Sequence, residues 1–284
     1  MFCKATAVCG LIRGYADAEK YATLIERNRA IAAVLYSQAP GDLDILLFHE
    51  GNIGAEQQRH IQSQTPELPL RFVDVSAEFN PSLVRTASQH CQSTHTSQRF
   101  PVGYKHMCRF WFHAFFKYTE SYRFVLRIDE DCVLQHFDYA GLKGRLDSKE
   151  LAYITPYWST DSGDVTMGLA KLATTFAAEK QLQVAAWPCL SKNPYTNVFF
   201  MDASVVRSLP HFQNFIDKVE ATGCIYVNRW GDLPLWGVVL WCLLPTRLAA
   251  QSPRIGYFHG SHKKLINSNK LPSQPRSSQH AQTK

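Results

Sequence analysis

The sequence predicts an α/β fold with a mostly parallel central sheet flanked by helices. Short apolar segments alternate with amphipathic ones in the first third of the chain, which is typical of βαβ units. The composition is that of a globular protein, since 45% of the 284 residues are hydrophobic and 19% are charged. No internal repeat is present. These observations exclude a disordered, collagen-like or coiled-coil protein.

In the first third, strands are expected at residues 5–12, 43–48 and 70–75, with helices at 17–36 and 55–63. An aromatic-rich helix is expected at 102–118, and a buried strand at 124–128. Further strands are expected at 152–155 and 197–201, and further helices at 165–182, 204–209, 212–221 and 235–244. We expect one folded domain over residues 1–266. Residues 267–284 are rich in Ser, Gln, Asn and Lys, which predicts a disordered tail.

The charge pattern gives little reason to expect a nucleic-acid partner. The net charge is +6, but five basic residues lie beyond the last motif, so the folded part is close to neutral. No run of ~18 uncharged apolar residues predicts a membrane span, and the N-terminus lacks a signal-peptide pattern. This chain is therefore expected to be soluble, with a cytoplasmic location favoured. The eight cysteines show no CxxC pair or zinc-finger spacing, so no disulfide framework is indicated. Cys9, Cys132 and Cys242 lie inside apolar runs and are expected to be small buried hydrophobes.

The tripeptide Asp129-Glu130-Asp131 directly follows the strand expected at 124–128. In open α/β sheets, ligands bind at the carboxyl ends of strands, where these carboxylates fall. Alternation predicts Asp129 and Asp131 on one side and Glu130 on the other. Such a pair suits Mn²⁺ or Mg²⁺ bridging diphosphate oxygens. The alternative is a solvated acidic turn.

Two later clusters could complete a site. Asp232 stands before Leu-Pro, which predicts either a helix N-cap or a carboxylate that accepts a proton or holds substrate hydroxyls. His259 is either a surface histidine or a third metal ligand beside Asp129 and Asp131. Arg13 follows the first strand, where nucleotide contacts usually begin in such sheets.

Five motifs occur in an order that resembles the fungal α-1,2-mannosyltransferase family. That family has Tyr-x-x-Met-Cys-Arg, Tyr-Arg…Arg-Val-Glu-Pro-Asn, Trp-Ser-Asn, Arg-Trp-Gly-Asp-Ala-Pro and Ile-Gly-Tyr-x-His. The corresponding segments here are 104–109 (YKHMCR), 122–131 (YRFVLRIDED), 195–197 (YTN), 229–234 (RWGDLP) and 255–259 (IGYFH). The resemblance covers residues 103–262 and is weak before them.

The resemblance implies a glycosyltransferase of the GT-A type with a divalent cation, usually manganese, and a GDP-sugar donor. A hexose, with mannose favoured, would pass to a glycan or other hydroxyl acceptor. Asp129 takes the place of the family's metal-binding Glu and Tyr104 that of a donor-site Tyr. Arg109 and Asp232 fall on motif positions expected to line the same cleft, and Arg109 and Asn197 are expected to bind the donor nucleotide. Arg109 could instead pair with a helix-face carboxylate. The rings of Trp230 and Trp236 suit sugar stacking, although a core position is the alternative.

This sequence departs from the family's pattern at functional positions and in its membrane anchor. Phe199 stands where the family has a Glu proposed as nucleophile, and Trp236 stands where a His is expected. The family's membrane anchor has no counterpart in this sequence. The chain is thus expected to be a divergent relative. A non-catalytic nucleotide-sugar or carbohydrate-binding relative and a metal-dependent phosphoesterase are the alternatives.

Overall fold

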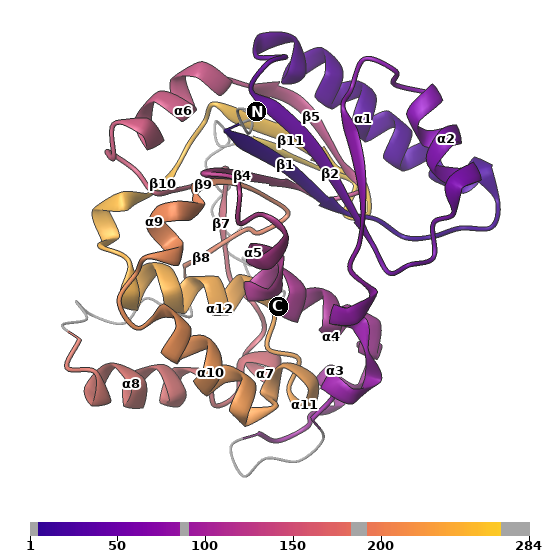
Figure 1. The fold of residues 1–284 in the computed structure, drawn as a ribbon. Helices are drawn as coiled ribbons and strands as arrows, with labels where there is room; N and C mark the ends of the chain where they lie inside the picture. The colour runs from indigo at the N-terminus through magenta and orange to yellow at the C-terminus, as the bar shows by residue number, and fades with distance from the viewer. Residues whose placement is uncertain (1–4, 86–90, 183–191, 268–284) are drawn as a thin grey trace, which may run out of the picture.

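A seven-stranded sheet forms the centre of the computed structural model, which describes residues 5–85, 91–182 and 192–267. The strand order is β10-β6-β9-β4-β1-β2-β3, and all neighbours are parallel except β9, which runs antiparallel to β4 and β6 (Figure 1). The predicted mostly parallel sheet is confirmed. Its strands are β1 (Thr6–Leu11), β2 (Leu43–His49), β3 (Leu70–Asp74), β4 (Phe124–Ile128), β6 (Tyr153–Thr155), β9 (Val198–Asp202) and β10 (Ala249–Gln251).

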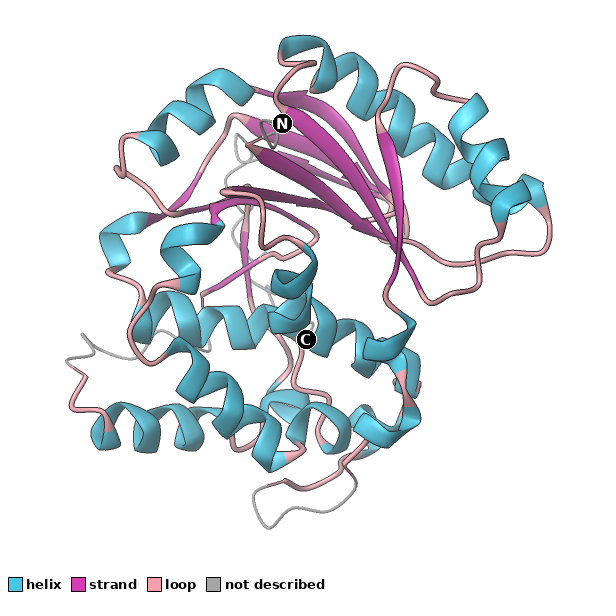
Figure 2. Ribbon diagram, viewed as in Figure 1, coloured by secondary structure: helices cyan, strands magenta, loops and turns pink. Residues whose placement is uncertain are grey.

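Helices cover both faces of this sheet because its strands alternate apolar side chains between the two faces (Figure 2). In β2, Ile45 and Leu47 pack against the layer of α1 (Ala22–Val34), α2 (Ala55–Ser63) and α6 (Tyr139–Asp147). Leu46 and Phe48 of the same strand pack into the opposite layer. That layer contains α4 (Val102–Arg109), η5 (Phe110–Ala114), α5 (Phe115–Tyr118), α8 (Leu169–Glu179), α10 (Phe212–Thr222) and α12 (Asp232–Val238).

A second, antiparallel sheet was not expected as a unit. It contains β5 (Cys132–Phe137), β11 (Ile255–His259) and β12 (Lys264–Asn267), and β5 follows β4 directly through the acidic turn. The remaining strands, β7 (Trp158–Ser159) and β8 (Asn193–Pro194), pair with each other. The other short helices are η1 (Ala18–Tyr21), η2 (Tyr36–Gln38), η3 (Ser76–Phe79), η4 (Pro81–Leu83), α3 (His95–Gln98), α7 (Gly163–Thr166), α9 (Ala203–Arg207), α11 (Cys224–Val227), η6 (Val239–Leu243) and η7 (Thr246–Leu248).

Several of the predicted helices are not continuous α-helices. The span 102–118 is helical throughout, but its middle, η5, is a π-helix, a local widening that is frequent near functional sites. The predicted helix 165–182 is instead divided into α7 and α8 by Gly168, which takes a left-handed φ of 82° that favours glycine.

One disulfide joins Cys91 to Cys224, with Cα atoms 5.4 Å apart, whereas the sequence had indicated none. Cys3 and Cys189 lie outside the described residues. Within the described ranges, every helix is too short or too polar to cross a membrane. The predicted tail also lies outside them, apart from Asn267, which ends β12.

Candidate functional site

The candidate site lies at the carboxyl edge of the parallel strands. Arg13 follows β1, the acidic turn follows β4, and Asn197 precedes the antiparallel β9, so all three reach the same edge. The backbone N–H of Arg13 donates to Glu130 Oε2 over 3.1 Å, and Asn197 Nδ2 donates to Asp129 Oδ2 over 2.9 Å. Burial raises the pKa of Glu130 to about 7. The structure thus brings together three segments from which site residues were predicted.

A buried arginine, Arg27 of α1, fixes the end of β4. Its Nε and Nη2 atoms donate to the Ile128 carbonyl over 3.1 and 2.8 Å. Gly10 makes room for it, because a Cβ at that position would lie 2.6 Å from Arg27 Nη2. Burial lowers the pKa of Arg27 to about 10, so it is still charged at neutral pH and offsets part of the negative charge of the acidic turn. Arg27 was not predicted from the sequence, because no pattern in its helix indicates a contact with β4, 101 residues further along the chain.

Arg127 of β4 lies between two of the predicted site carboxylates. Its Nε and Nη2 donate to the two oxygens of Asp129 over 2.7 and 3.0 Å, and its Nη1 donates to Asp232 Oδ2 over 2.5 Å. The guanidinium stacks 4.2 Å from the centroid of the Trp111 ring. Burial alone would lower the pKa of Arg127, but the carboxylates of Asp129 and Asp232 outweigh it and raise the pKa. Arg127 therefore stays charged and orients both acids.

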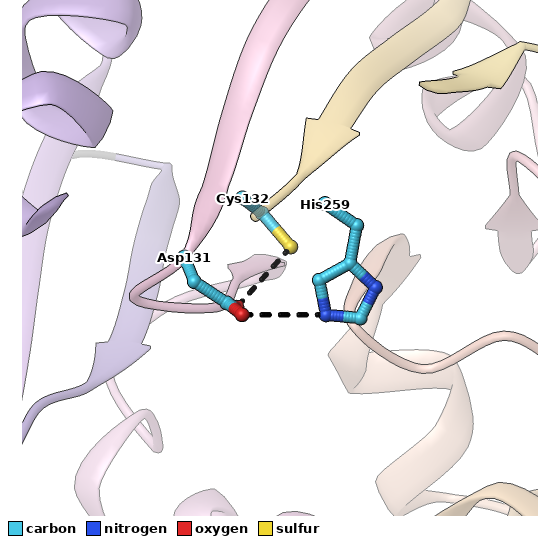
Figure 3. Close-up of side chains that lie close together, drawn as sticks. All are labelled: Asp131, Cys132 and His259. Carbon is cyan, nitrogen blue, oxygen red and sulfur yellow. Dashed lines mark hydrogen bonds and ion pairs between the residues drawn. The ribbon is translucent and has the colours of Figure 1, made fainter. Parts of the chain in front are cut away.

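The structure places Asp131 beside His259, as two predicted metal ligands should lie. The Asp131 Oδ2 and His259 Nε2 atoms are 3.5 Å apart, and Cys132 Sγ is 4.0 Å from Asp131 Oδ1 (Figure 3). The backbone N–H of Ser261 donates to Asp131 Oδ2 over 3.0 Å. Burial would raise the pKa of Asp131, but the Ser261 hydrogen bonds and the nearby His259 lower it. Burial also lowers the pKa of His259, which favours the neutral ring that binds metals.

The third predicted ligand, Asp129, is not part of this cluster. The Asp129 carboxylate accepts hydrogen bonds from Arg127 and Asn197. By contrast, Asp131, Cys132 and His259 each have one ligand atom within 4.8 Å of the other two. One oxygen, one nitrogen and one sulfur atom fit a divalent transition-metal ion. Cys132 was taken for a small buried hydrophobe, although its place directly after the acidic turn could have identified it.

Tyr104, a predicted donor-site residue, belongs to a neighbouring cluster around Arg229. Its hydroxyl accepts a hydrogen bond from Arg229 Nη2 over 2.8 Å. The Arg229 guanidinium also pairs with Asp161 and lies 4.4 Å from the centroid of the Phe100 ring. Arg229 adopts a φ of 68°, which is costly for a residue other than glycine and is typical of functional sites. The motif at 229–234 was identified in the sequence, but Arg229 was not among the predicted site residues.

Several predictions are not supported. Arg109 pairs with Glu78 and Glu220 over 3.1 Å each, which matches the alternative of a helix-face ion pair. Trp230 and Trp236 are fully buried, and their indole N–H groups donate to the carbonyls of Met167 and Trp111, so neither ring can stack on a sugar. The N-cap of α12 is Gly231 rather than Asp232, which leaves the Asp232 side chain for Arg127.

Phe199 is an apolar core residue at the position where the resembling family has a glutamate. It is fully buried in β9 and stacks on Tyr153 with ring centroids 5.3 Å apart. Trp236 also packs against it, with ring centroids 6.0 Å apart. An aromatic cluster therefore occupies the place of the proposed nucleophile.

The sheet order, the acidic turn after β4 and the histidine that ends β11 define the class of fold, which is that of the GT-A glycosyltransferases. No protein-family model matches the sequence, and no curated protein matches it. Among solved structures, core-mannan synthase A from Aspergillus fumigatus, in its Mn/GDP form, matches with a TM-score of 0.70 at 15% identity over 90% of this chain and 74% of that one.

The mannosyltransferase Ktr4p from S. cerevisiae matches with a TM-score of 0.71 at 15% identity, over 90% of this chain and 70% of that one. Mouse xyloside xylosyltransferase 1 matches with a TM-score of 0.51 at 11% identity, over 87% of this chain and 84% of that one. At these identities the similarity establishes the fold. The fold expected from the resemblance to fungal mannosyltransferases is therefore confirmed.

Proposed function

We propose that this chain is a glycosyltransferase that moves a hexose, with mannose favoured, from a GDP-sugar to a glycan or other hydroxyl acceptor. The observation that carries the proposal is that Asp131, in the turn at the carboxyl end of β4, lies 3.5 Å from His259 at the end of β11. The similar synthase from Aspergillus fumigatus is described in a form with Mn and GDP, which supports the same ligands here.

In this proposal Asp131 and His259 hold a divalent cation. Bound there, the cation would offset negative charge on the leaving diphosphate. Arg13, exposed at the end of β1, would contact the nucleotide diphosphate from the opposite side of the acidic turn. Asn197 and Arg127 keep Asp129 in place at the floor of the site.

Asp232 is the proposed catalytic carboxylate. It lies at the first turn of α12, where the helix dipole favours an ionised acid, and Arg127 fixes its orientation. From there it would accept a proton from the acceptor hydroxyl or hold acceptor hydroxyls in position. Tyr104 would stand at the adjacent wall, oriented by Arg229.

A thermal-shift panel of nucleotide sugars, with and without Mn²⁺, tests donor binding. At a hundredfold excess over Kd, a bound donor stabilises a protein by about 2.7 kcal/mol, which is a measurable shift in Tm. We expect the largest Mn²⁺-dependent shift with GDP-mannose. Asp131→Ala should abolish the Mn²⁺-dependent part, whereas Asp217→Ala, on the exposed side of α10, should keep it. The absence of a shift with every nucleotide sugar would contradict the proposal.

A non-catalytic nucleotide-sugar-binding relative is the second candidate, and the buried Phe199 favours it. Slow hydrolysis of a bound donor separates the two functions. Hydrolysis that depends on Asp131 and Asp232 supports the transferase, whereas donor binding without any hydrolysis or transfer supports the binding protein.

A further inference from the structure

The thiol of Cys132 has a position that neither the fold nor the predicted metal site explains. Cys132 is the first residue of β5, and His259, the last residue of β11, is its direct partner in the antiparallel register. Directly opposed residues project their side chains to the same face of a sheet. The sulfur and the imidazole therefore lie together, and Asp131 stands beside both (Figure 3).

We propose that Cys132 is a thiolate ligand of the cation at this site and that the site prefers zinc-like ions to Mn²⁺ or Mg²⁺. Asp131 and His259 would supply the other two protein ligands, and an open position would remain for a diphosphate oxygen. This inference deepens the proposed function, because it specifies the cation of the same site. On binding, the thiol proton passes to solvent as the sulfur–metal bond forms.

The spacing of the three ligand atoms suits a tetrahedral ion after small adjustments. Zinc–ligand bonds of about 2.0–2.3 Å place neighbouring ligand atoms roughly 3.3–3.8 Å apart. Asp131 Oδ2 already lies 3.5 Å from His259 Nε2, whereas Cys132 Sγ lies 4.0 Å from the other carboxylate oxygen, Oδ1. One ligand atom of each of the three residues lies within 4.8 Å of the others. A side-chain rotation of Asp131 or Cys132 would therefore complete the geometry.

The surroundings of His259 are those of a metal-binding histidine. Metal-bound histidines commonly use their second ring nitrogen in a hydrogen bond that fixes the ring. Here the hydroxyl of Tyr195 is hydrogen-bonded to His259 Nδ1 over 3.0 Å. His259 Nε2 faces Asp131 and is also hydrogen-bonded to the Ser261 hydroxyl over 3.3 Å, a bond that an ion on Nε2 would replace. The N–H of Gly260 also donates to the Asp131 carbonyl over 2.8 Å and joins the acidic turn to the end of β11.

The ligand set also explains why the ion would differ from manganese. Manganese and magnesium favour oxygen-rich sites, but Asp129, which could have supplied a second carboxylate, is held by Arg127. A thiolate and an imidazole in its place favour zinc or cobalt.

Cobalt spectroscopy tests the inference on the intact chain without donor or acceptor. A thiolate bound to Co²⁺ gives an intense charge-transfer band in the near ultraviolet, and we expect this band in the wild-type protein. It should disappear in Cys132→Ser and weaken strongly in His259→Ala. Cys9→Ser is the matched control, because Cys9 is also a fully buried thiol in a strand but lies outside the cluster. It should keep the band.

Competition against bound Co²⁺ measures the preference. We expect Cys132→Ser to weaken Zn²⁺ binding at least ~10-fold while changing Mn²⁺ binding less than about threefold. Co²⁺ binding to the wild-type protein without a thiolate band would overturn the inference even if the variants fail to fold, and so would a band that persists in Cys132→Ser. Because this test contains no donor, its failure does not bear on donor binding. A cation held by Asp131 and His259 without the thiolate would refute this inference and leave the proposed function intact.

Discussion

Two arginines in different parts of the molecule are each held between two carboxylates. Arg127 in β4 bonds Asp129 and Asp232, and its side chain is 2% exposed. Arg109 at the end of α4 bonds Glu78 and Glu220, and its side chain is 11% exposed. The pairing chemistry is the same in both, so the pairing itself does not distinguish a functional site from a structural ion pair.

Location and excess charge distinguish the two clusters. The Arg109 cluster connects η3, α4 and α10 within one helical layer, and its acids have further partners in Lys117 and His113. The Arg127 cluster connects the carboxyl end of β4 to the start of α12, and two acids share one buried cation. Asp131 and His259 are next to it in the acidic turn and at the end of β11. An acid-rich cluster at the carboxyl edge of a parallel sheet is suited to bind a cationic ligand, whereas a balanced cluster inside a helical layer stabilises packing.

The largest effect is expected from Arg127→Met. The variant leaves Asp129 and Asp232 buried without their counter-charge, which typically costs about 3–5 kcal/mol. Urea denaturation measures the loss in the free energy of unfolding. The nucleotide-dependent thermal shift should also disappear, because both acids lose their orientation. A variant with an unchanged free energy of unfolding would show that Arg127 does not stabilise this edge.

A smaller effect is expected from Arg109→Met. Glu78 and Glu220 keep Lys117 and His113 as partners, so we expect a loss of about 1–3 kcal/mol in the free energy of unfolding. The nucleotide-dependent thermal shift should remain at the wild-type level, which separates this cluster from the site. Loss of that shift in a folded Arg109→Met protein would show that Arg109 contributes to donor binding, as its motif predicted.

The same comparison shows what the sequence could predict. The strand at 124–128 and the helix at 55–63 were predicted at their observed bounds, because each is a short local pattern with clear ends. The long-range pairings of Arg109 with Glu220 and of Arg127 with Asp232 could not be predicted. Glu220 is 111 residues from Arg109, and Asp232 is 105 residues from Arg127, so tertiary structure alone brings them together.

In the candidate site, too, local features could be predicted from the sequence and long-range contacts could not. The acidic turn was identified because its residue types and its place after a strand carry chemical information in themselves. His259 was identified by its residue type and its motif. The role of Cys132 depends on β5, which pairs with β11 far along the chain and whose polar Gln135 and His136 weaken the strand pattern. Trp230 and Trp236 were misread because a tryptophan in a motif carries no sign of its burial.

Glu220→Gln should have the smallest effect and a defined pH dependence. Burial would raise the pKa of Glu220, but its hydrogen bond and charge interaction with His113 and its pairing with Arg109 lower it below the usual 4.5. A folded-state pKa below the unfolded one gives stability that is present above about pH 4.5 and is lost as the pH falls through the folded-state value. The wild-type protein should therefore exceed the variant by about 1 kcal/mol in the free energy of unfolding at pH 7.

That difference should shrink as the pH falls below about 4.5, since the protonated glutamate and the glutamine that replaces it are then equivalent in charge. Urea denaturation of both proteins at pH 7 and at about pH 3.5 measures it. Asp217→Asn, an exposed carboxylate on the same helix, is the control and should show no such convergence. A constant difference between wild type and Glu220→Gln at both pH values would mean that hydrogen-bond geometry, and not charge, holds the Arg109 cluster together. Charge-dependent stability would then be expected at the Arg127 cluster and not at the Arg109 cluster. Among the ion pairs of the described residues, Asp129 and Asp232 have no cationic partner besides Arg127.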